Sequence, residues 1–146
     1  QGGRFLDVGC GSGILSLAAV CPGLHTALGL DIEAQAVEVA THNALANARQ
    51  ESTQFLHGSL EKSAGQHFAL IAANIYLGPL VEMIHPFLRR LDDQGTLLLS
   101  GVLLRQEAVL HAALRKSGLL VTRRLVEDEW LALAAQRDSS STPPAS

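Results

Sequence analysis

A glycine-rich loop directly after a short apolar run is the strongest constraint on the fold of this chain. The run Arg4–Val8 predicts a buried strand, the loop spans Gly9–Gly13, and Gly13–Val20 predicts a helix that stops at Cys21–Gly23. Glycine lets a backbone adopt positive φ and approach a ligand closely. A strand, a glycine-rich turn and a helix in this order are typical of a loop that binds a nucleoside cofactor.

An acidic residue in the next predicted strand–helix turn supports this interpretation. Thr26–Leu30 predicts a second strand, and Asp31 follows it directly. A carboxylate at this position can accept hydrogen bonds from both hydroxyls of a ribose. A loop that only made a tight turn between a strand and a helix would need neither three glycines nor this acid.

The spacing of the glycines narrows the choice of cofactor. The dinucleotide pattern G-x-G-x-x-G, counted from Gly9, requires a glycine at the position of Ile14. The glycines stand instead at positions 9, 11 and 13. A phosphate-binding P-loop would require a following Gly-Lys-Ser/Thr, which is missing. The loop therefore matches neither of these two nucleotide-binding patterns.

Alternating apolar runs and helical periodicity continue along the chain and predict a doubly wound α/β sheet. Residues 92–95 predict a turn, and Pro86 is expected to kink or split its helix. Only residues 127–129 separate the last two strands, which predicts an antiparallel hairpin at the end of a seven-stranded, mostly parallel sheet. The remaining predicted strands are Thr53–His57, Phe68–Ala73, Thr96–Ser100, Leu119–Val126 and Trp130–Ala135, and the remaining predicted helices are Glu33–Ala48, Leu77–Leu91 and Leu103–Lys116.

Composition excludes several classes of function. The net charge is −3 and no cluster of Lys and Arg exceeds a pair, whereas a nucleic-acid surface needs a basic stripe. No apolar run reaches the ~18 residues of a membrane span, and no signal peptide is recognisable. The two cysteines, Cys10 and Cys21, and the six histidines lack metal-ligand spacing, so we expect no metal. So few cysteines favour a reducing, cytoplasmic location.

One polar residue marks the side of the sheet where a substrate would bind. Asn74 follows the apolar run Phe68–Ala73 and is expected at the carboxyl edge of a central strand, where such sheets bind their ligands. A lone Asn that ends a strand is usually a turn residue. Tyr76 is near enough in sequence to line the same site. Trp130 could form a wall of the site, but we expect it to pack on an edge strand.

The loop, together with Asp7 before it, resembles motif I of class I S-adenosylmethionine-dependent methyltransferases. The stretch Leu6–Ala18 and the string from Ala73 to Leu80 resemble PrmA-type enzymes more specifically. These enzymes methylate amino groups of a large-subunit ribosomal protein. The resemblance covers about residues 3 to 137 and includes Gly29–Val37, Gly58–Leu60, Leu99–Leu103 and Glu129–Leu133.

The resemblance implies a Rossmann-like fold, S-adenosyl-L-methionine as the cofactor, and a protein substrate that is methylated on lysine side chains or on its N-terminus. It implies that Asn74 lies beside the transferable methyl group, where we expect it to orient the acceptor amine. Asp7 would either make a polar contact near the cofactor's amino group or brace the loop. The cofactor-binding residues so implied are Asp7, Gly9, Cys10, Gly11, Gly13, Asp31, Ile32, Ser59, Leu60 and Asn74.

Two other functions fit the same core: methylation of N or O atoms of a small molecule, and cofactor binding without catalysis. PrmA-type enzymes carry an N-terminal substrate-recognition domain and a linker before motif I, whereas this chain starts at Gln1 and has Met83 as its only Met. We therefore expect a fragment, with one catalytic domain over residues 1–137 and part of the cofactor pocket open. The Ser- and Pro-rich residues 138–146 are expected to form a disordered tail.

Overall fold

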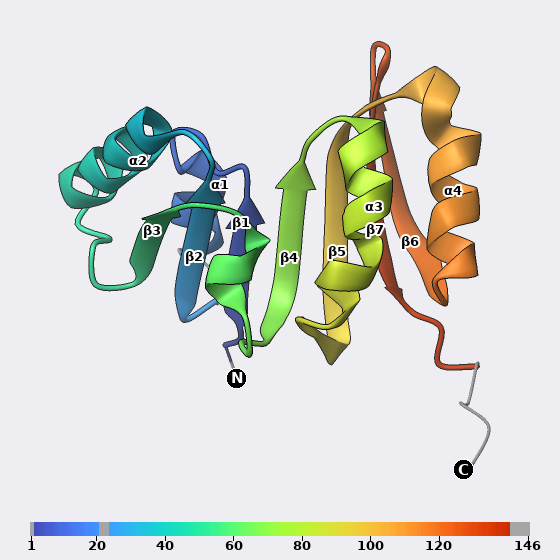
Figure 1. The fold of residues 1–146 in the computed structure, drawn as a ribbon, viewed down its shortest axis with the longest axis horizontal. Helices are drawn as coiled ribbons and strands as arrows, with labels where there is room; N and C mark the ends of the chain where they lie inside the picture. The colour runs from blue at the N-terminus through green and yellow to red at the C-terminus, as the bar shows by residue number, and fades with distance from the viewer. Residues whose placement is uncertain (1, 21–23, 141–146) are drawn as a thin grey trace.

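The computed structural model describes residues 2–20 and 24–140, and within them the chain forms a seven-stranded sheet with the strand order β3-β2-β1-β4-β5-β7-β6 (Figure 1). The strands are β1 (Arg4–Val8), β2 (Thr26–Asp31), β3 (Thr53–His57), β4 (Phe68–Asn74), β5 (Leu91–Leu103), β6 (Leu119–Glu127) and β7 (Trp130–Arg137). The helices are α1 (Ile14–Ala19), α2 (Ala34–Ala46), α3 (Leu77–Leu88) and α4 (Glu107–Lys116), with short 3-10 turns at Leu60–Ser63 and Leu104–Gln106.

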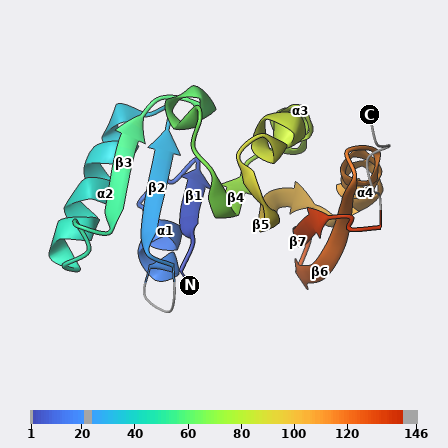
Figure 2. The same ribbon diagram turned by 90° about the horizontal axis from the view of Figure 1, so that it is seen from below.

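Helices cover the sheet on opposite faces, as α1 and α3 show when the sheet is seen from below (Figure 2). On one face, α3 and α4 bury an apolar stripe against the central strands, with Leu80, Ile84 and Phe87 from α3 almost inaccessible to solvent. On the other face, Ala40 and Ala44 of α2 pack with Phe55 and Cys10. Strands covered on both sides need continuous apolar runs, and this requirement explains their sequences.

The chain reverses its strand order between β1 and β4. β1 pairs in parallel with β2 on one side and with β4 on the other. The chain therefore adds β2 and β3 on one side of β1, and then crosses to the other side to add β4 and β5. Ligands of doubly wound sheets bind beyond the carboxyl ends of the strands at such a switch point. The loop after β1, Asp31 at the end of β2 and Asn74 at the end of β4 all belong to this edge, the upper edge in Figure 1.

The C-terminal hairpin confirms the predicted departure from parallel pairing. β7 inserts between β5 and β6 and pairs antiparallel to both. Trp130 therefore begins an internal strand, and its predicted place on an edge strand is wrong because β6 is the edge. Of the predicted tail, residues 138–140 are described, and the Asp138 amide donates to the Gly118 carbonyl at 2.9 Å. The rest of the tail and the predicted helix stop at Cys21–Gly23 lie outside the described residues.

Several predicted boundaries differ from the structure. The predicted turn at residues 92–95 is wrong: these residues belong to β5, in an irregular stretch where the partners Phe68 and Leu70 of β4 face Leu91 and Thr96. Of the two effects predicted for Pro86, a kink or a split of its helix, the split is wrong. α3 runs through Pro86 and ends at Leu88, so the missing N–H falls in the last turn. The predicted helix from Leu103 begins instead with a 3-10 turn and becomes α-helical only at Glu107.

Gly29 in β2 is a close-packing position on which the loop depends, and Gly29→Ala is expected to destabilise the fold. A Cβ there would lie 2.4 Å from Phe55 Cδ1 and 3.0 Å from Cys10 Cβ. Overpacking of this kind costs at least about 1 kcal/mol in the free energy of unfolding. Urea unfolding measures it, with Gly78→Ala as the control, because a Cβ at Gly78 meets nothing within 4 Å. Equal stability of the two variants would contradict the packing.

Candidate cofactor and acceptor site

The loop after β1 folds so that its backbone turns sharply towards β2. Gly9 has φ 76° and Gly13 has φ 81°, values at which a side chain would be strained. The amides of Gly9 and Cys10 both donate to the carbonyl of Leu30, at 2.8 and 3.0 Å. A Cβ on Gly13 would also lie 2.9 Å from the Phe55 ring. Glycine is therefore required at both ends of the loop. Gly9 is required for its backbone conformation, and Gly13 is required both for its conformation and for the space that Phe55 occupies.

Asp31 links the loop to the start of α2. Its Oδ2 accepts the Gly11 amide at 2.9 Å, and its Oδ1 accepts the Glu33 amide at 3.0 Å. An ionised carboxylate offers about four lone-pair sites. Two backbone bonds therefore leave this partly exposed group with acceptor capacity for further hydroxyl donors, as a ribose would provide.

An apolar cavity of about 330 Å³ opens beside Asp31. Of the described residues that line it, Asp31 alone is charged. Ile32 and Tyr76 also line the cavity. Ile32 is 76% exposed and Tyr76 is 80% exposed, so the border of the cavity has apolar surface that a ligand can reach. The lining residues are Val8, Gly9, Leu30, Asp31, Ile32, Gly58, Ser59, Leu60, Ile75, Tyr76, Pro79 and Met83. An apolar slot with one carboxylate matches the chemistry of a purine nucleoside, which has a flat base and a ribose with two hydroxyls on neighbouring ring carbons.

The predicted cofactor residues fall into separate groups in the structure. Gly9, Asp31, Ile32, Ser59 and Leu60 line the cavity. Gly11 supports Asp31 from the loop. The other members, Asp7, Cys10, Gly13 and Asn74, are not among the lining residues of this cavity.

Asp7 is almost completely buried beneath the loop and contacts α1. The Ser16 hydroxyl donates to Asp7 Oδ2 at 2.9 Å, and both residues are inaccessible or nearly so. Burial raises the pKa of Asp7 above its ordinary value of 3.8, and the hydrogen bonds from Ser16 oppose this rise. Two roles were considered for Asp7, and this contact favours the one in which Asp7 braces the loop.

Burial likewise raises the pKa of the Cys10 thiol to about 12, so this thiol is protonated at neutral pH.

The raised pKa of Asp7 predicts a particular dependence of stability on pH. The folded chain holds this proton more tightly than the unfolded chain, so the free energy of unfolding falls as pH rises from about 3.8 through the raised pKa. Asp7→Asn keeps an acceptor for Ser16 and is expected to remove this fall, leaving the variant at least as stable as the parent at pH 7. Urea unfolding between pH 4 and 7 measures the difference. An unchanged slope in the variant would contradict a raised pKa.

Asn74 lies at the exposed end of β4, opposite Ser100 of β5. The next residue, Ile75, lines the nucleoside cavity, whereas Asn74 lines a neighbouring cavity of about 390 Å³ towards the hairpin. Gly101, with φ 81°, leaves room for the Asn74 side chain: a Cβ there would lie 2.5 Å from Asn74 Oδ1. The role of Gly101 was not predicted, because the predicted strand Thr96–Ser100 stops one residue before it, whereas β5 continues to Leu103. A glycine inside a strand signals a bulge or a close approach.

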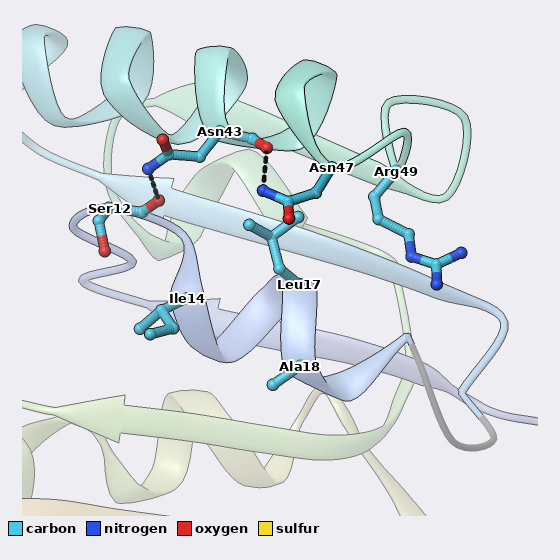
Figure 3. Close-up of a pocket in the computed structure, with 7 residues that line it drawn as sticks. All are labelled: Ser12, Ile14, Leu17, Ala18, Asn43, Asn47 and Arg49. Atoms are coloured by element: carbon cyan, nitrogen blue, oxygen red, sulfur yellow. Dashed lines mark hydrogen bonds between the residues drawn. The ribbon is translucent and has the colours of Figure 1, made fainter.

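A further pocket, of about 450 Å³, lies between α1 and α2 (Figure 3). Asn43 Nδ2 donates to the Ser12 carbonyl at 2.9 Å and so fixes the loop to α2. Arg49 is the charged group among the described residues that line the pocket, and no carboxylate is among them. This pocket therefore offers no acid for ribose hydroxyls.

Among the described residues, no group of three or more His, Cys, Asp or Glu side chains could hold a metal ion. Within the same part of the chain, no helix is long and apolar enough to cross a membrane.

The strand order, the terminal hairpin and the glycine loop with its acid define a Rossmann-like methyltransferase fold. The family model of ribosomal protein L11 methyltransferase (PrmA) matches residues 1–138. The chain belongs to this family, as its resemblance predicts.

Individual relatives agree with this assignment. Ribosomal protein L11 methyltransferase from Caulobacter sp. (strain K31) is 34% identical over 138 residues, which cover 92% of this chain and 47% of that protein. The enzyme of the same name from Chromohalobacter salexigens is 35% identical over 136 residues, covering 91% of this chain and 44% of that protein. The chain thus spans about half the length of these curated relatives.

Solved structures confirm the fold. The ribosomal protein L11 methylase from Lactobacillus delbrueckii subsp. bulgaricus superposes with a TM-score of 0.87 at 28% identity, over 94% of this chain and 71% of that one. An O-methyltransferase from neocarzinostatin biosynthesis, solved with S-adenosylmethionine, shares the fold alone, with a TM-score of 0.73 at 15% identity over 92% of this chain and 49% of that one. Family and fold together support S-adenosylmethionine as the cofactor.

Proposed function

We propose that this chain is the catalytic part of an S-adenosylmethionine-dependent methyltransferase that modifies amino groups of a protein. The observation that carries this proposal is the apolar cavity beside Asp31, which adjoins Asn74 across Ile75. Asp31 would hold the ribose, Ile32, Ser59 and Leu60 would surround the base, and the loop would support the rest of the cofactor. When bound, the cofactor supplies a methyl group on a positively charged sulfur.

The residues of the chain then have to align an amine and exclude water, since an activated methyl group needs no nucleophilic side chain. The acceptor must present a neutral lone pair. A lysine amine has an ordinary pKa of about 10.4, and the nearby positive charge of a sulfonium would lower that pKa. Asn74 ends β4 beside the cavity, and its side-chain oxygen can accept a hydrogen bond from the amine N–H. This bond would point the lone pair away from Asn74.

The substrate that the relatives suggest is a ribosomal protein. The curated relatives carry the name ribosomal protein L11 methyltransferase, and the family model of that name matches residues 1–138, a range that contains the cavity, Asn74 and the hairpin. A ribosomal protein substrate would place the reaction in the cytoplasm. Lysine side chains and a free N-terminus are both amines of the required kind.

Incubation of the chain with ribosomal proteins and methyl-labelled S-adenosylmethionine tests this function. We expect label in one or a few protein bands, on amino groups located by mass spectrometry. Asp31→Ala serves as the paired variant and should lose most of the label at limiting cofactor. Label only in small molecules would favour the alternative acceptor class, and no label at all would favour a cofactor-binding scaffold. Either result would contradict the proposal.

A further inference from the structure

The turn between β2 and α2, which carries Asp31, is held in place by the neighbouring strand β3. Asp31 and His57 are partners in the parallel pairing of the two strands. The Gly58 amide donates to the Asp31 carbonyl at 2.8 Å and so fixes the end of β2 to the end of β3. The carbonyl oxygen of the next residue, Ile32, lies 3.1 Å from Nε2 of His57. The turn is therefore tied to β3 twice, once by the backbone and once by a side chain.

The alternation of side chains along β3 explains why His57 reaches this carbonyl. Residues two apart in a strand point to the same face of the sheet, so His57 shares a face with Phe55. Phe55 packs with Ala40 and Ala44, so this is the face that α2 covers. His57 is the last residue of β3, and α2 begins at Ala34. The imidazole ring therefore lies beside the turn that leads into α2.

The contact defines which nitrogen of the His57 ring carries a proton. A carbonyl oxygen can only accept a hydrogen bond, so Nε2 has to be the donor to Ile32. The neutral Nε2–H tautomer and the charged imidazolium both meet this requirement. The ring therefore acts as a hydrogen-bond donor to the backbone, and this role needs no change of charge.

One peptide group is held at both of its polar ends. The carbonyl oxygen of Ile32 accepts from His57, and the N–H of the same peptide group, that of Glu33, donates to Asp31 Oδ1 at 3.0 Å. A peptide group is planar, so its C=O and its N–H turn together. Rotation of this peptide after loss of the His57 ring would therefore also break the bond from Glu33 to Asp31.

The direction of the Asp31 carboxylate depends on that bond. Backbone amides hold both of its oxygens, Gly11 at Oδ2 and Glu33 at Oδ1. Loss of the Glu33 bond would let the carboxylate turn about its Cβ–Cγ bond. A group that is already ordered binds a ligand more tightly than one that has to be ordered on binding. A freely turning Asp31 would therefore bind ribose hydroxyls more weakly.

We propose that His57 is a positioning residue for the cofactor, which holds the peptide between Ile32 and Glu33 and thereby directs the Asp31 carboxylate. The proposal rests on the proposed function, in which Asp31 holds the ribose. His57 is not among the described residues that line the nucleoside cavity, so its effect passes through Asp31. It acts on the affinity for the cofactor and not on the alignment of the acceptor amine at Asn74.

Calorimetric titration of His57 variants with S-adenosylhomocysteine tests this role. His57→Leu removes the donor and is expected to weaken binding about three- to tenfold, the scale of one neutral hydrogen bond. His57→Gln keeps an N–H donor of similar reach and is expected to bind within about twofold of the parent chain. His42→Leu is the matched control and should bind as the parent does, because His42 is also exposed but lines a separate pocket on α2.

Two further measurements show whether His57 acts through the turn and Asp31. In ¹⁵N spectra of the chain without cofactor, the Glu33 amide signal should move in His57→Leu and return towards its parent position in His57→Gln, because this amide donates to Asp31. In the Asp31→Ala background, His57→Leu should weaken binding less than about twofold, since the carboxylate that it directs is missing. Urea unfolding of each variant shows that it is folded.

The outcomes for His57 and for the proposed function are distinguishable. Unchanged binding by His57→Leu, equal losses in His57→Gln and His57→Leu, or a full loss by His57→Leu in the Asp31→Ala background would overturn the positioning role. The proposed function would survive each of these results, because the parent chain would still bind S-adenosylhomocysteine. A parent chain that binds none would contradict the proposed function itself, and with it a role of His57 in binding.

Discussion

Asp31→Ala is expected to weaken the binding of S-adenosylhomocysteine by about 1.5–3 kcal/mol, or roughly 10- to 150-fold in the dissociation constant. Asp31 is the charged residue of the nucleoside cavity, and its carboxylate retains lone pairs beyond the two that accept the Gly11 and Glu33 amides. Removal of this group takes away a charge-assisted partner for the ribose. Isothermal titration calorimetry measures the loss.

Two companion variants make this result interpretable. Glu33→Gln changes a nearby acid that does not line the cavity, and it should leave the affinity unchanged. Asp31→Asn keeps one acceptor oxygen and should fall between Asp31→Ala and the parent chain. Unfolding curves of each variant show whether loss of the Gly11 bond also loosens the loop. An Asp31→Ala variant that folds and binds with unchanged affinity would mean that the ribose is held elsewhere.

Asn74→Ala is expected to lower the turnover number for methyl transfer on the order of 100-fold, the scale of a misaligned acceptor. Asn74 lies at the end of β4 and does not line the nucleoside cavity, so affinity for the cofactor should change little. A loss of kcat with an unchanged cofactor affinity is the expected pattern, because the residue acts on orientation.

Asn47→Ala is the matched control for this variant. Asn47 lines the pocket between α1 and α2, and its side-chain amide donates from the C-cap of α2 to the Asn43 carbonyl at 2.8 Å. Turnover should therefore stay close to that of the parent chain. If Asn74→Ala kept full turnover, or if the two variants lost the same activity, Asn74 would have no specific role in orienting the amine.

The sequence was sufficient to predict the features that depend on local pattern. Three glycines after the first apolar run predicted the loop, and an acidic residue after the second apolar run predicted the position of Asp31. Both predictions depend only on residues that are close together in the sequence. The terminal hairpin was predicted correctly because only three residues separate its strands. Residues 92–95 were wrongly predicted to form a turn. A short polar segment before an apolar run has the same sequence pattern whether it forms a turn or an irregular first part of a strand.

Features that depend on tertiary contacts could not be predicted. Gly101 matters because its space is occupied by Asn74 from a neighbouring strand, and the sequence separates the two by many residues. The hydrogen bond between Asp7 and Ser16 favours bracing of the loop, one of the two roles that the sequence left open. Trp130 was assigned to an edge because the insertion of β7 between β5 and β6 is a property of the topology.

An NMR titration of the ¹⁵N-labelled chain with S-adenosylhomocysteine shows whether the cavity beside Asp31 holds the cofactor. We expect saturable shifts of the amides of Gly9, Gly11, Ile32, Ser59 and Leu60, all lost or weakened together in Asp31→Ala. The pocket between α1 and α2 is the internal comparison, and Asn47 and Arg49 should shift little. Saturable shifts centred on that pocket, or no saturable shifts at all, would mean that the cofactor does not bind beside Asp31.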